Sequence, residues 1–223
     1  MIKQLKIKNF RCFKNSLITF KELSVLVGKN NSGKSTIIEA LRIISIITNR
    51  YKNLKYTKSP SWTSIQTESF GVSPSINNLD ISPNNIFHLY GEPPALLEVK
   101  FENKMRIETY IGEDADVFAI IYDQDNKEVS TKRRANSIDL PIINILPQIS
   151  PLLREEKIIK FETVQSNLLT KLSSRNFRNQ IRYYNDDFSR FCELAERTWK
   201  GLSISNISNL SGFQNNHELT LKK

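Results

Sequence analysis

The sequence predicts an α/β fold in which a mixed sheet holds a phosphate-binding loop and a helical subdomain follows. Three observations predict it. An apolar run at 23–27 precedes a glycine-rich stretch at 28–36, and apolar residues then recur at helical spacing. Alternating apolar segments between 95 and 131 indicate an antiparallel meander, with parallel strands expected around the loop. From 152 to 199 apolar residues recur at intervals of three and four, as in packed helices.

The stretch 28–36 reads Gly-Lys-Asn-Asn-Ser-Gly-Lys-Ser-Thr and matches the P-loop (Walker A) pattern GxxxxGK[ST] at every required position. Gly28 and Gly33 allow a tight turn that brings backbone N–H groups against phosphate oxygens. We expect Lys34 to reach the β- and γ-phosphates and the Ser35 hydroxyl to bind Mg²⁺. The motif therefore predicts binding of ATP with Mg²⁺. The predicted nucleotide-binding residues are Gly28, Lys29, Asn30, Asn31, Ser32, Gly33, Lys34, Ser35 and Thr36.

Composition limits the class of protein. The chain has 223 residues, of which 39% are hydrophobic and 25% charged, as expected for a globular chain with a buried core. Its longest apolar run, 37–47, is interrupted by charges, so no bilayer span is expected, and residues 1–8 alternate unlike a signal peptide. Cys12 and Cys192 lie far apart and have no metal-ligand spacing. We expect reduced thiols in a cytoplasmic protein.

Five segments are expected along the chain. Between 50 and 94 the periodicity is lost, and five of the eight prolines fall there. We expect a strand–loop–helix core at 1–49, an irregular insertion at 50–94, a β-meander at 95–151, a helical lid at 152–200 and the start of a second lobe at 201–223. Strands are predicted at 2–8, 16–20, 22–27, 95–101, 105–111, 117–122, 128–131, 142–146, 202–206 and 218–222.

The start of the chain resembles a known group of ATPases. Residues 7–13 read Ile-Lys-Asn-Phe-Arg-Cys-Phe, Asn30 stands within the loop, and Glu39-Ala40-Leu41 follows in the predicted helix. Together with 23–36, these segments resemble the amino-terminal lobe of the head of ABC-type P-loop ATPases of the SMC, RecF and OLD-nuclease group. The likeness covers residues 1–45. Two later segments, 144–148 and 174–180, look like parts of bacterial RecF-like ATPases, some with antiphage roles.

The resemblance implies a function in DNA repair or antiphage defence. It implies an ATP-binding head that acts as a homodimer, with DNA and a nuclease partner or fused nuclease domain as possible partners. Gln148 is similar to the glutamine that helps hold Mg²⁺ in this group, and 152–200 to its lid. By the same analogy Arg11 lies near the nucleotide. The alternatives for Arg11 and Gln148 are a solvated strand-end charge and an ordinary surface amide.

One departure from the group concerns the end of the chain. The group completes its site after the lid with a signature segment, an apolar strand ending in Asp-Glu, and a histidine. Residues 211–213, Ser-Gly-Phe, match the signature poorly, and His217 has no Asp-Glu strand before it. We therefore expect an amino-terminal piece of a longer ATPase that by itself hydrolyses ATP negligibly.

Two other functions stay open. Asp123 ends the apolar run 117–122 and could assist Mg²⁺, which would make this a complete small P-loop NTPase or kinase. Gln124 stands where a catalytic Glu is expected, and 125–127 look like a hairpin turn, so a hairpin is favoured. The second alternative is a non-catalytic nucleic-acid-binding module, which the net charge of +9 permits. Its candidate phosphate contacts are Lys132, Arg133, Arg134, Lys171, Arg175, Arg178 and Arg182, the last three on one predicted helix face.

Overall fold

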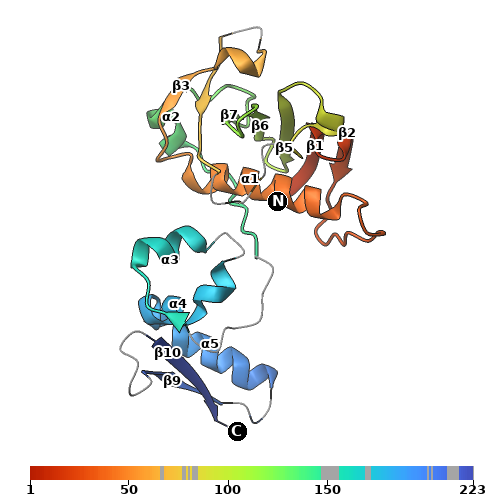
Figure 1. The fold of residues 1–223 in the computed structure, drawn as a ribbon. Helices are drawn as coiled ribbons and strands as arrows, with labels where there is room; N and C mark the ends of the chain where they lie inside the picture. The colour runs from red at the N-terminus through yellow and green to blue at the C-terminus, as the bar shows by residue number, and fades with distance from the viewer. Residues whose placement is uncertain are drawn as a thin grey trace. The chain divides into compact units, whose positions relative to one another are not determined.

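The computed structural model describes two compact units, Met1–Ile145 and Leu146–Lys223 (Figure 1). The described residues are 1–65, 68–76, 79, 81, 85–146, 156–168, 172–199, 201, 203–209 and 216–222. Predictions that concern other residues, among them Gln148, Lys171 and the segment 211–213, lie outside the described residues.

The first unit is built on a seven-stranded sheet. Its strands are β1 (Ile2–Phe10), β2 (Phe13–Thr19), β3 (Tyr56–Lys58), β4 (Phe70–Val72), β5 (Ala95–Phe101), β6 (Arg106–Ile111) and β7 (Val117–Tyr122). Their order is β2-β1-β5-β6-β7-β4-β3. The meander predicted from alternating apolar residues is confirmed, because β5, β6 and β7 pair as consecutive antiparallel neighbours.

The prediction of parallel strands around the loop is wrong for the described residues, where every pairing in this sheet is antiparallel. Residues 22–27 form no strand. Leu23, Val25 and Val27 are instead 83%, 76% and 88% exposed. The apolar run indicated a buried strand, but a strand also needs a neighbour to accept its backbone hydrogen bonds, and no described segment pairs with this one.

The segment 50–94 is more regular than predicted. It contributes β3 and β4, which pair with each other, and β4 then pairs with β7. Two short 3₁₀ helices, η1 (Ser61–Thr63) and η4 (His88–Tyr90), follow β3 and precede β5. Strands of three residues carry too little alternation to be recognised among prolines and serines, which explains the error.

The predicted strands 128–131 and 142–146 are also absent. Glu128 makes only an isolated bridge with Tyr122, after which Thr131 caps the helix α2 (Lys132–Ser137) by accepting from the Arg134 amide. Ile143 instead forms hydrogen bonds with the first helix. The Ile143 amide donates to Thr48 Oγ1 at 3.2 Å, so a side chain of that helix replaces a strand partner.

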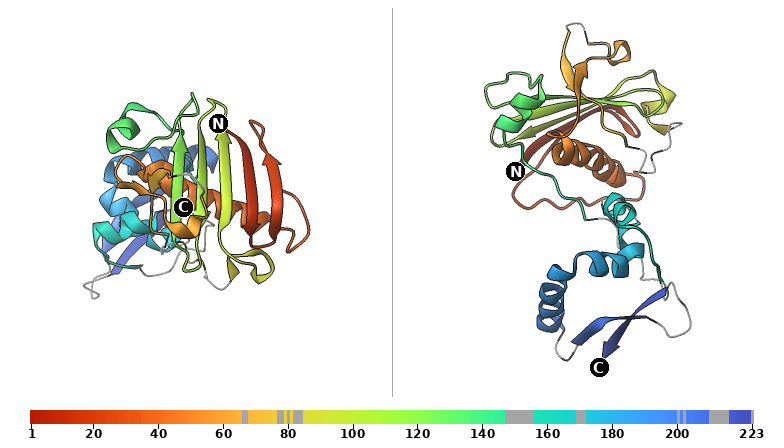
Figure 2. Two further views of the ribbon diagram at one scale, coloured as in Figure 1. Left: turned by 90° about the horizontal axis from the view of Figure 1, so that it is seen from above. Right: turned by 90° about the vertical axis from the view of Figure 1, so that its left-hand side faces the viewer.

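The helix α1 (Lys34–Arg50) covers one face of the sheet, as Figure 2 shows. Apolar residues at helical spacing form its buried side and pack into a core with inward-facing residues of β1 and β5. Full burial of each such side chain contributes about 1.5–3 kcal/mol. The fully buried residues of this interface include Leu5, Ile7, Phe10, Ile43, Ile44, Ile47, Leu97 and Val99. The core therefore holds α1 against the sheet.

The second unit combines short helices with a small sheet. Its helices are α3 (Phe161–Asn167), the 3₁₀ helix η5 (Ser173–Asn176), α4 (Phe177–Tyr183) and α5 (Asn185–Thr198). Its strands β8 (Glu156–Lys157), β9 (Ser203–Asn209) and β10 (Asn216–Lys222) form an antiparallel sheet in the order β8-β10-β9. The strands predicted at 202–206 and 218–222 overlap β9 and β10. The helices lie within the segment 152–200 that was predicted to be helical, but β8 also falls there and was not predicted.

A buried polar cluster organises the second unit. The Glu156 carboxylate accepts from the backbone amides of Arg178 and Asn179, both at 2.9 Å, and from Asn179 Nδ2 at 2.6 Å. It thereby caps the first turn of α4 with a negative charge. Arg178 is only 6% exposed and its guanidinium lies 4.0 Å from Glu156. The prediction that Arg178 shares an exposed face with Arg175 and Arg182 is therefore wrong.

Candidate functional site

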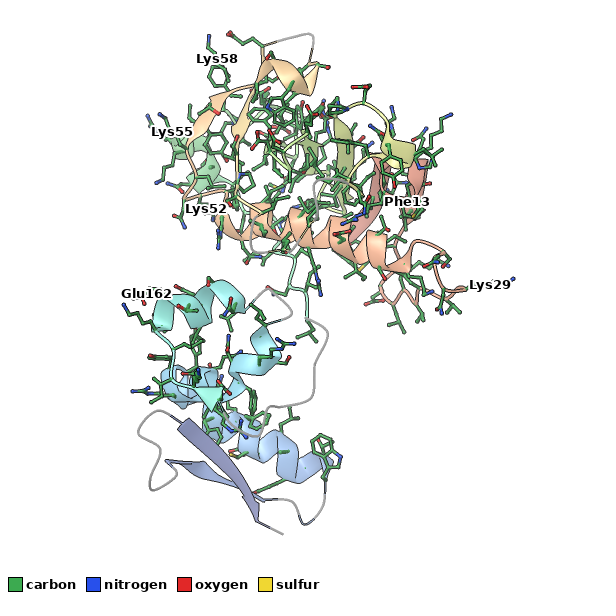
Figure 3. The ribbon with its side chains drawn as sticks, in the orientation of Figure 1. Phe13, Lys29, Lys52, Lys55, Lys58 and Glu162 are labelled. Carbon is green, nitrogen blue, oxygen red and sulfur yellow. The ribbon has the colours of Figure 1, made fainter. Side chains whose placement is uncertain are left out.

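The loop at 28–33 joins directly to α1, as the motif predicted. Gly33 forms the N-terminal cap with φ 91°, in the left-handed region that glycine tolerates best. A Cβ atom at Gly33 would lie 2.6 Å from Phe13 Cζ and 3.0 Å from Cys12 Sγ. Figure 3 shows Phe13 beside the first turn of α1. Both the backbone angle and the close packing against β2 therefore require glycine at this position.

The lysine of the motif bends over the loop. Lys34 Nζ donates to the carbonyl oxygens of Gly28 and Lys29, each at 2.7 Å. Lys29 is exposed at the outer edge of the loop, and Figure 3 shows its side chain directed away from the body of the unit. Of the two lysines in the motif, only Lys34 thus places its charge over the loop, where the first amides of α1 also lie.

A cavity of about 680 Å³ opens above this loop. Its volume falls in the range typical of small-molecule sites. Three parts of the chain meet there: the loop and first turn of α1, the turn between β1 and β2, and the end of the 50–94 segment. The lining residues are Arg11, Cys12, Asn30, Asn31, Ser32, Gly33, Lys34, Ser35, Thr36, Asn85, Phe87, Leu89 and Tyr90. The structure therefore brings Arg11 and seven residues of the predicted loop into one site.

Arg11 is held in the lining by contacts on both sides. Its Nη2 donates to Glu39 Oε1 at 2.7 Å, and its backbone amide donates to the Ile86 carbonyl at 2.6 Å. The Arg11 backbone adopts φ 52°, which turns the chain sharply between β1 and β2. The guanidinium is thus anchored to α1 at the rim of the cavity.

The segment 85–91 was not predicted to belong to the site. Asn9 fastens it there: Asn9 Nδ2 donates to the Glu92 carbonyl at 2.7 Å and to the Pro94 carbonyl at 3.2 Å, and Asn9 Oδ1 accepts from the His88 amide at 3.2 Å. The ring Nδ1 of His88 lies 3.1 Å from the Arg11 carbonyl oxygen. The Asn-Phe-Arg element is the one signal in the sequence that could have indicated this contact, since Asn9 is its first residue.

Comparison with known proteins places the chain in a family. The sequence matches the AAA ATPase domain family over residues 1–217. The chain belongs to this family. Membership indicates an ATP-binding ATPase domain.

One curated relative matches locally. An ATP/GTP phosphatase of Helicobacter pylori (strain ATCC 700392 / 26695) is 50% identical over 42 residues, which are 18% of this chain and 11% of that protein. The aligned stretch thus spans about a tenth of the relative.

Asp123, which could assist Mg²⁺ in one alternative interpretation of the sequence, has a structural role in this ATPase domain. It follows β7 at a hairpin turn and accepts from the Asp125 amide at 3.0 Å and the Lys127 amide at 2.9 Å, and it also pairs with Arg134. Burial acts to raise the pKa of the Asp123 carboxyl. This effect of burial is outweighed by hydrogen bonds from the Lys127 amide, the Arg134 guanidinium and the Asp125 amide. They hold the pKa of the Asp123 carboxyl below its ordinary value. These contacts agree with the turn predicted at 125–127, and Asp123 is not among the residues that line the cavity beside the loop.

Among the described residues there is neither a metal-ligating cluster nor a helix that could span a membrane. Within the described ranges no three His, Cys, Asp or Glu side chains gather as a metal site. Of the helices that the structure describes, none is both long and apolar enough to cross a bilayer.

Proposed function

We propose that this chain is the ATP-binding portion of an ATPase and that residues 28–36 hold the triphosphate. One observation carries the proposal: the left-handed Gly33 joins the loop to α1 while Lys34 bends over the loop. Backbone amides of the loop and of the first helical turn offer donors to phosphate oxygens, and the helix dipole favours an anion there. The Lys34 ammonium supplies the balancing positive charge.

The residues of the loop fit a phosphate group and its magnesium ion. The absence of a Cβ at Gly28, where one would lie 2.6 Å from Ser32 Oγ, leaves the cradle open to phosphate oxygens. Ser35 is exposed at the start of α1, and its hydroxyl would hold Mg²⁺. Gln148 is proposed as a further ligand on its resemblance alone. When bound, Mg²⁺ would neutralise phosphate charge.

Arg11 is proposed as a contact to the nucleotide. It lines the cavity beside the loop, and the Glu39 carboxylate fixes the direction of its guanidinium. A guanidinium recognises phosphate oxygens through paired donors, which suits this position at the rim. Arg11 would thus be a second cationic side chain, with Lys34, in the lining of the cavity.

We also propose a biological role, which rests on the resemblance to known ATPases. The likeness of 7–13 and 23–36 to the RecF, SMC and OLD group supports a cytoplasmic ATPase that acts as a homodimer in DNA repair or antiphage defence. The local match to an ATP/GTP phosphatase supports nucleoside triphosphate hydrolysis by the whole protein. DNA contact would come from exposed residues of α2 and of the helical unit, such as Arg133, Arg175 and Arg182.

Alkylation of Cys12 tests the location of the nucleotide. Cys12 is exposed and lines the cavity, with its Sγ 3.6 Å from Thr36 Oγ1. In a Cys192→Ser background Cys12 is the sole thiol, and ATP–Mg²⁺ should slow its reaction with a maleimide, followed by mass spectrometry. Protection should disappear when Lys34→Ala is added.

The converse variant supplies the control. Cys12→Ser leaves Cys192, where burial and the Glu196 carboxylate raise the pKa of the thiol and slow its reaction. ATP should not change the alkylation rate of Cys192. Equal rates for Cys12 with and without saturating ATP would contradict nucleotide binding in this cavity.

A further inference from the structure

We propose that Leu89 and Tyr90 form a platform that binds the base of the nucleotide and favours purines over pyrimidines. The inference rests on the proposed function, because phosphates held at 28–36 direct the rest of the nucleotide into the same cavity. Leu89 and Tyr90 line that cavity from the side of the 50–94 segment, together with Asn85 and Phe87.

The platform is apolar and open. Leu89 is 82% exposed and Tyr90 is 84% exposed, although they neighbour each other and line a cavity that also holds the polar side chains of the loop. Adjacent large apolar side chains left in water beside a polar loop are typical of a binding surface. The same cavity is also lined by Lys34 and Arg11, which suit phosphates, so the apolar pair suits the uncharged end of the same ligand.

The backbone of the platform is strained. Leu89 has φ 49° and Tyr90 has φ 56°, values in the left-handed region that bulky residues rarely adopt. Such conformations persist only where surrounding contacts enforce them, and they concentrate at ligand-binding segments. Here the strained pair is also the exposed pair, so the strain does not serve packing of these two side chains in the core.

The contacts that enforce this conformation come from Asn9, near the end of β1 and two residues before Arg11. Asn9 binds the residues before and after the pair, at the His88 amide and the Glu92 carbonyl. Close packing adds to this, because a Cβ at Gly91 would lie 3.0 Å from the His88 carbonyl oxygen. Leu89 and Tyr90 are therefore held at a fixed position relative to Arg11, and a fixed platform loses little freedom when a base stacks on it.

The chemistry of the platform points to a nucleobase. An aromatic ring binds the π-face of any base, and stacking on an aromatic side chain contributes about 1–3 kcal/mol per base. A purine covers more of a tyrosine ring and of the adjacent leucine than a pyrimidine does. The Asn85 amide, with one acceptor and two donors, is the polar group of this wall that could meet the edge of the base.

Calorimetric titrations with four ligands test the platform. The wild-type chain is titrated with ATP, GTP, CTP and inorganic triphosphate, each with Mg²⁺. We expect ATP and GTP to bind more tightly than CTP, and inorganic triphosphate to bind most weakly. Tyr90→Ala should lower ATP affinity roughly 5- to 150-fold, which is the stacking contribution converted to a ratio, and leave triphosphate affinity unchanged. Tyr90→Phe, which keeps the ring, should retain wild-type affinity.

The outcomes separate this inference from the proposed function. If the wild type binds ATP and Tyr90→Ala binds it equally tightly, the platform is refuted while phosphate binding stands. If CTP binds as tightly as ATP, the purine preference is refuted. If the wild type binds neither ATP nor inorganic triphosphate, the proposed function fails and the platform fails with it. Because Tyr90 is exposed, its variants should fold, which Trp62 fluorescence verifies.

Discussion

Arg11 Nη2 lies 2.7 Å from Glu39 Oε1, and this ion pair joins the turn after β1 to the second turn of α1. Their side chains are only 23% and 22% exposed. The pair therefore spans the two elements that border the loop 28–36, and it links the Asn-Phe-Arg element to the Glu-Ala-Leu element of the sequence.

A double-mutant cycle of Arg11→Met and Glu39→Gln should give a coupling of about 1 kcal/mol in the free energy of unfolding, since the pair is largely shielded from water. The measurement is urea unfolding followed by Trp62 fluorescence in a Trp199→Phe background. Additive losses from the two single variants would show that the ion pair does not stabilise the unit.

Replacing Gly33 by alanine should both destabilise the first unit and abolish ATP binding. The left-handed backbone costs a side chain about 1–2 kcal/mol, and the contact with Phe13 adds roughly 1–3 kcal/mol. Gly201→Ala is the matched control, because Gly201 also has a positive φ of 85° but has nothing within 4 Å of an added Cβ. Thermal unfolding that shows equal losses for both variants would contradict the close packing around Gly33.

Asp123→Asn should lower the free energy of unfolding at pH 7 by about 1.5–3 kcal/mol, the value of a hydrogen bond to a charged group, and leave ATP affinity unchanged. Because the folded pKa is depressed, the stabilisation is complete above the unfolded pKa of about 3.9 and is lost as pH falls through the folded value. The difference between wild type and variant should thus shrink below pH 4 in urea titrations. A difference that grows on acidification would reverse the assigned direction.

Glu156→Ala should destabilise the second unit by about 3–5 kcal/mol, because the amides of Arg178 and Asn179 and the Arg178 charge lose a buried partner. Trp199 fluorescence in a Trp62→Phe background reports this unit, which contains no other tryptophan. Arg182→Gln is the control on the exposed side of α4, and we expect it to change stability by less than about 0.5 kcal/mol. Similar effects of the two variants would indicate that the Glu156 cluster is not buried.

The sequence predicted the loop, α1 and the meander because local signals specify them. Glycine positions and apolar spacing around Gly33 and Ile44 require no knowledge of distant segments. The segment 22–27 shows the limit of such signals: its apolar residues indicated a strand, but pairing depends on segments far away in the sequence. The strands β3 and β4 were missed for another reason, because three residues carry too little alternation to be recognised.

The candidate site was predicted only in part. Its loop and Arg11 followed from motif and resemblance, and the structure places them around one cavity. Leu89 and Tyr90 gave no signal, because their position depends on hydrogen bonds from Asn9, 79 to 85 residues away. Arg178 was misjudged because helical spacing cannot reveal a buried carboxylate such as Glu156 on another element.

The most direct measurement of the central claim is calorimetric titration of ATP–Mg²⁺ into three proteins: wild type, Lys34→Ala and Lys29→Ala. Lys34 bends over the loop, whereas Lys29 points away from it. The two variants therefore remove the same charge from two different positions in one motif. Lys34→Ala should lower affinity by roughly 100-fold or more, the loss of one or two charged hydrogen bonds, and Lys29→Ala by less than about 3-fold. Equal affinity of wild type and Lys34→Ala would contradict triphosphate binding at residues 28–36.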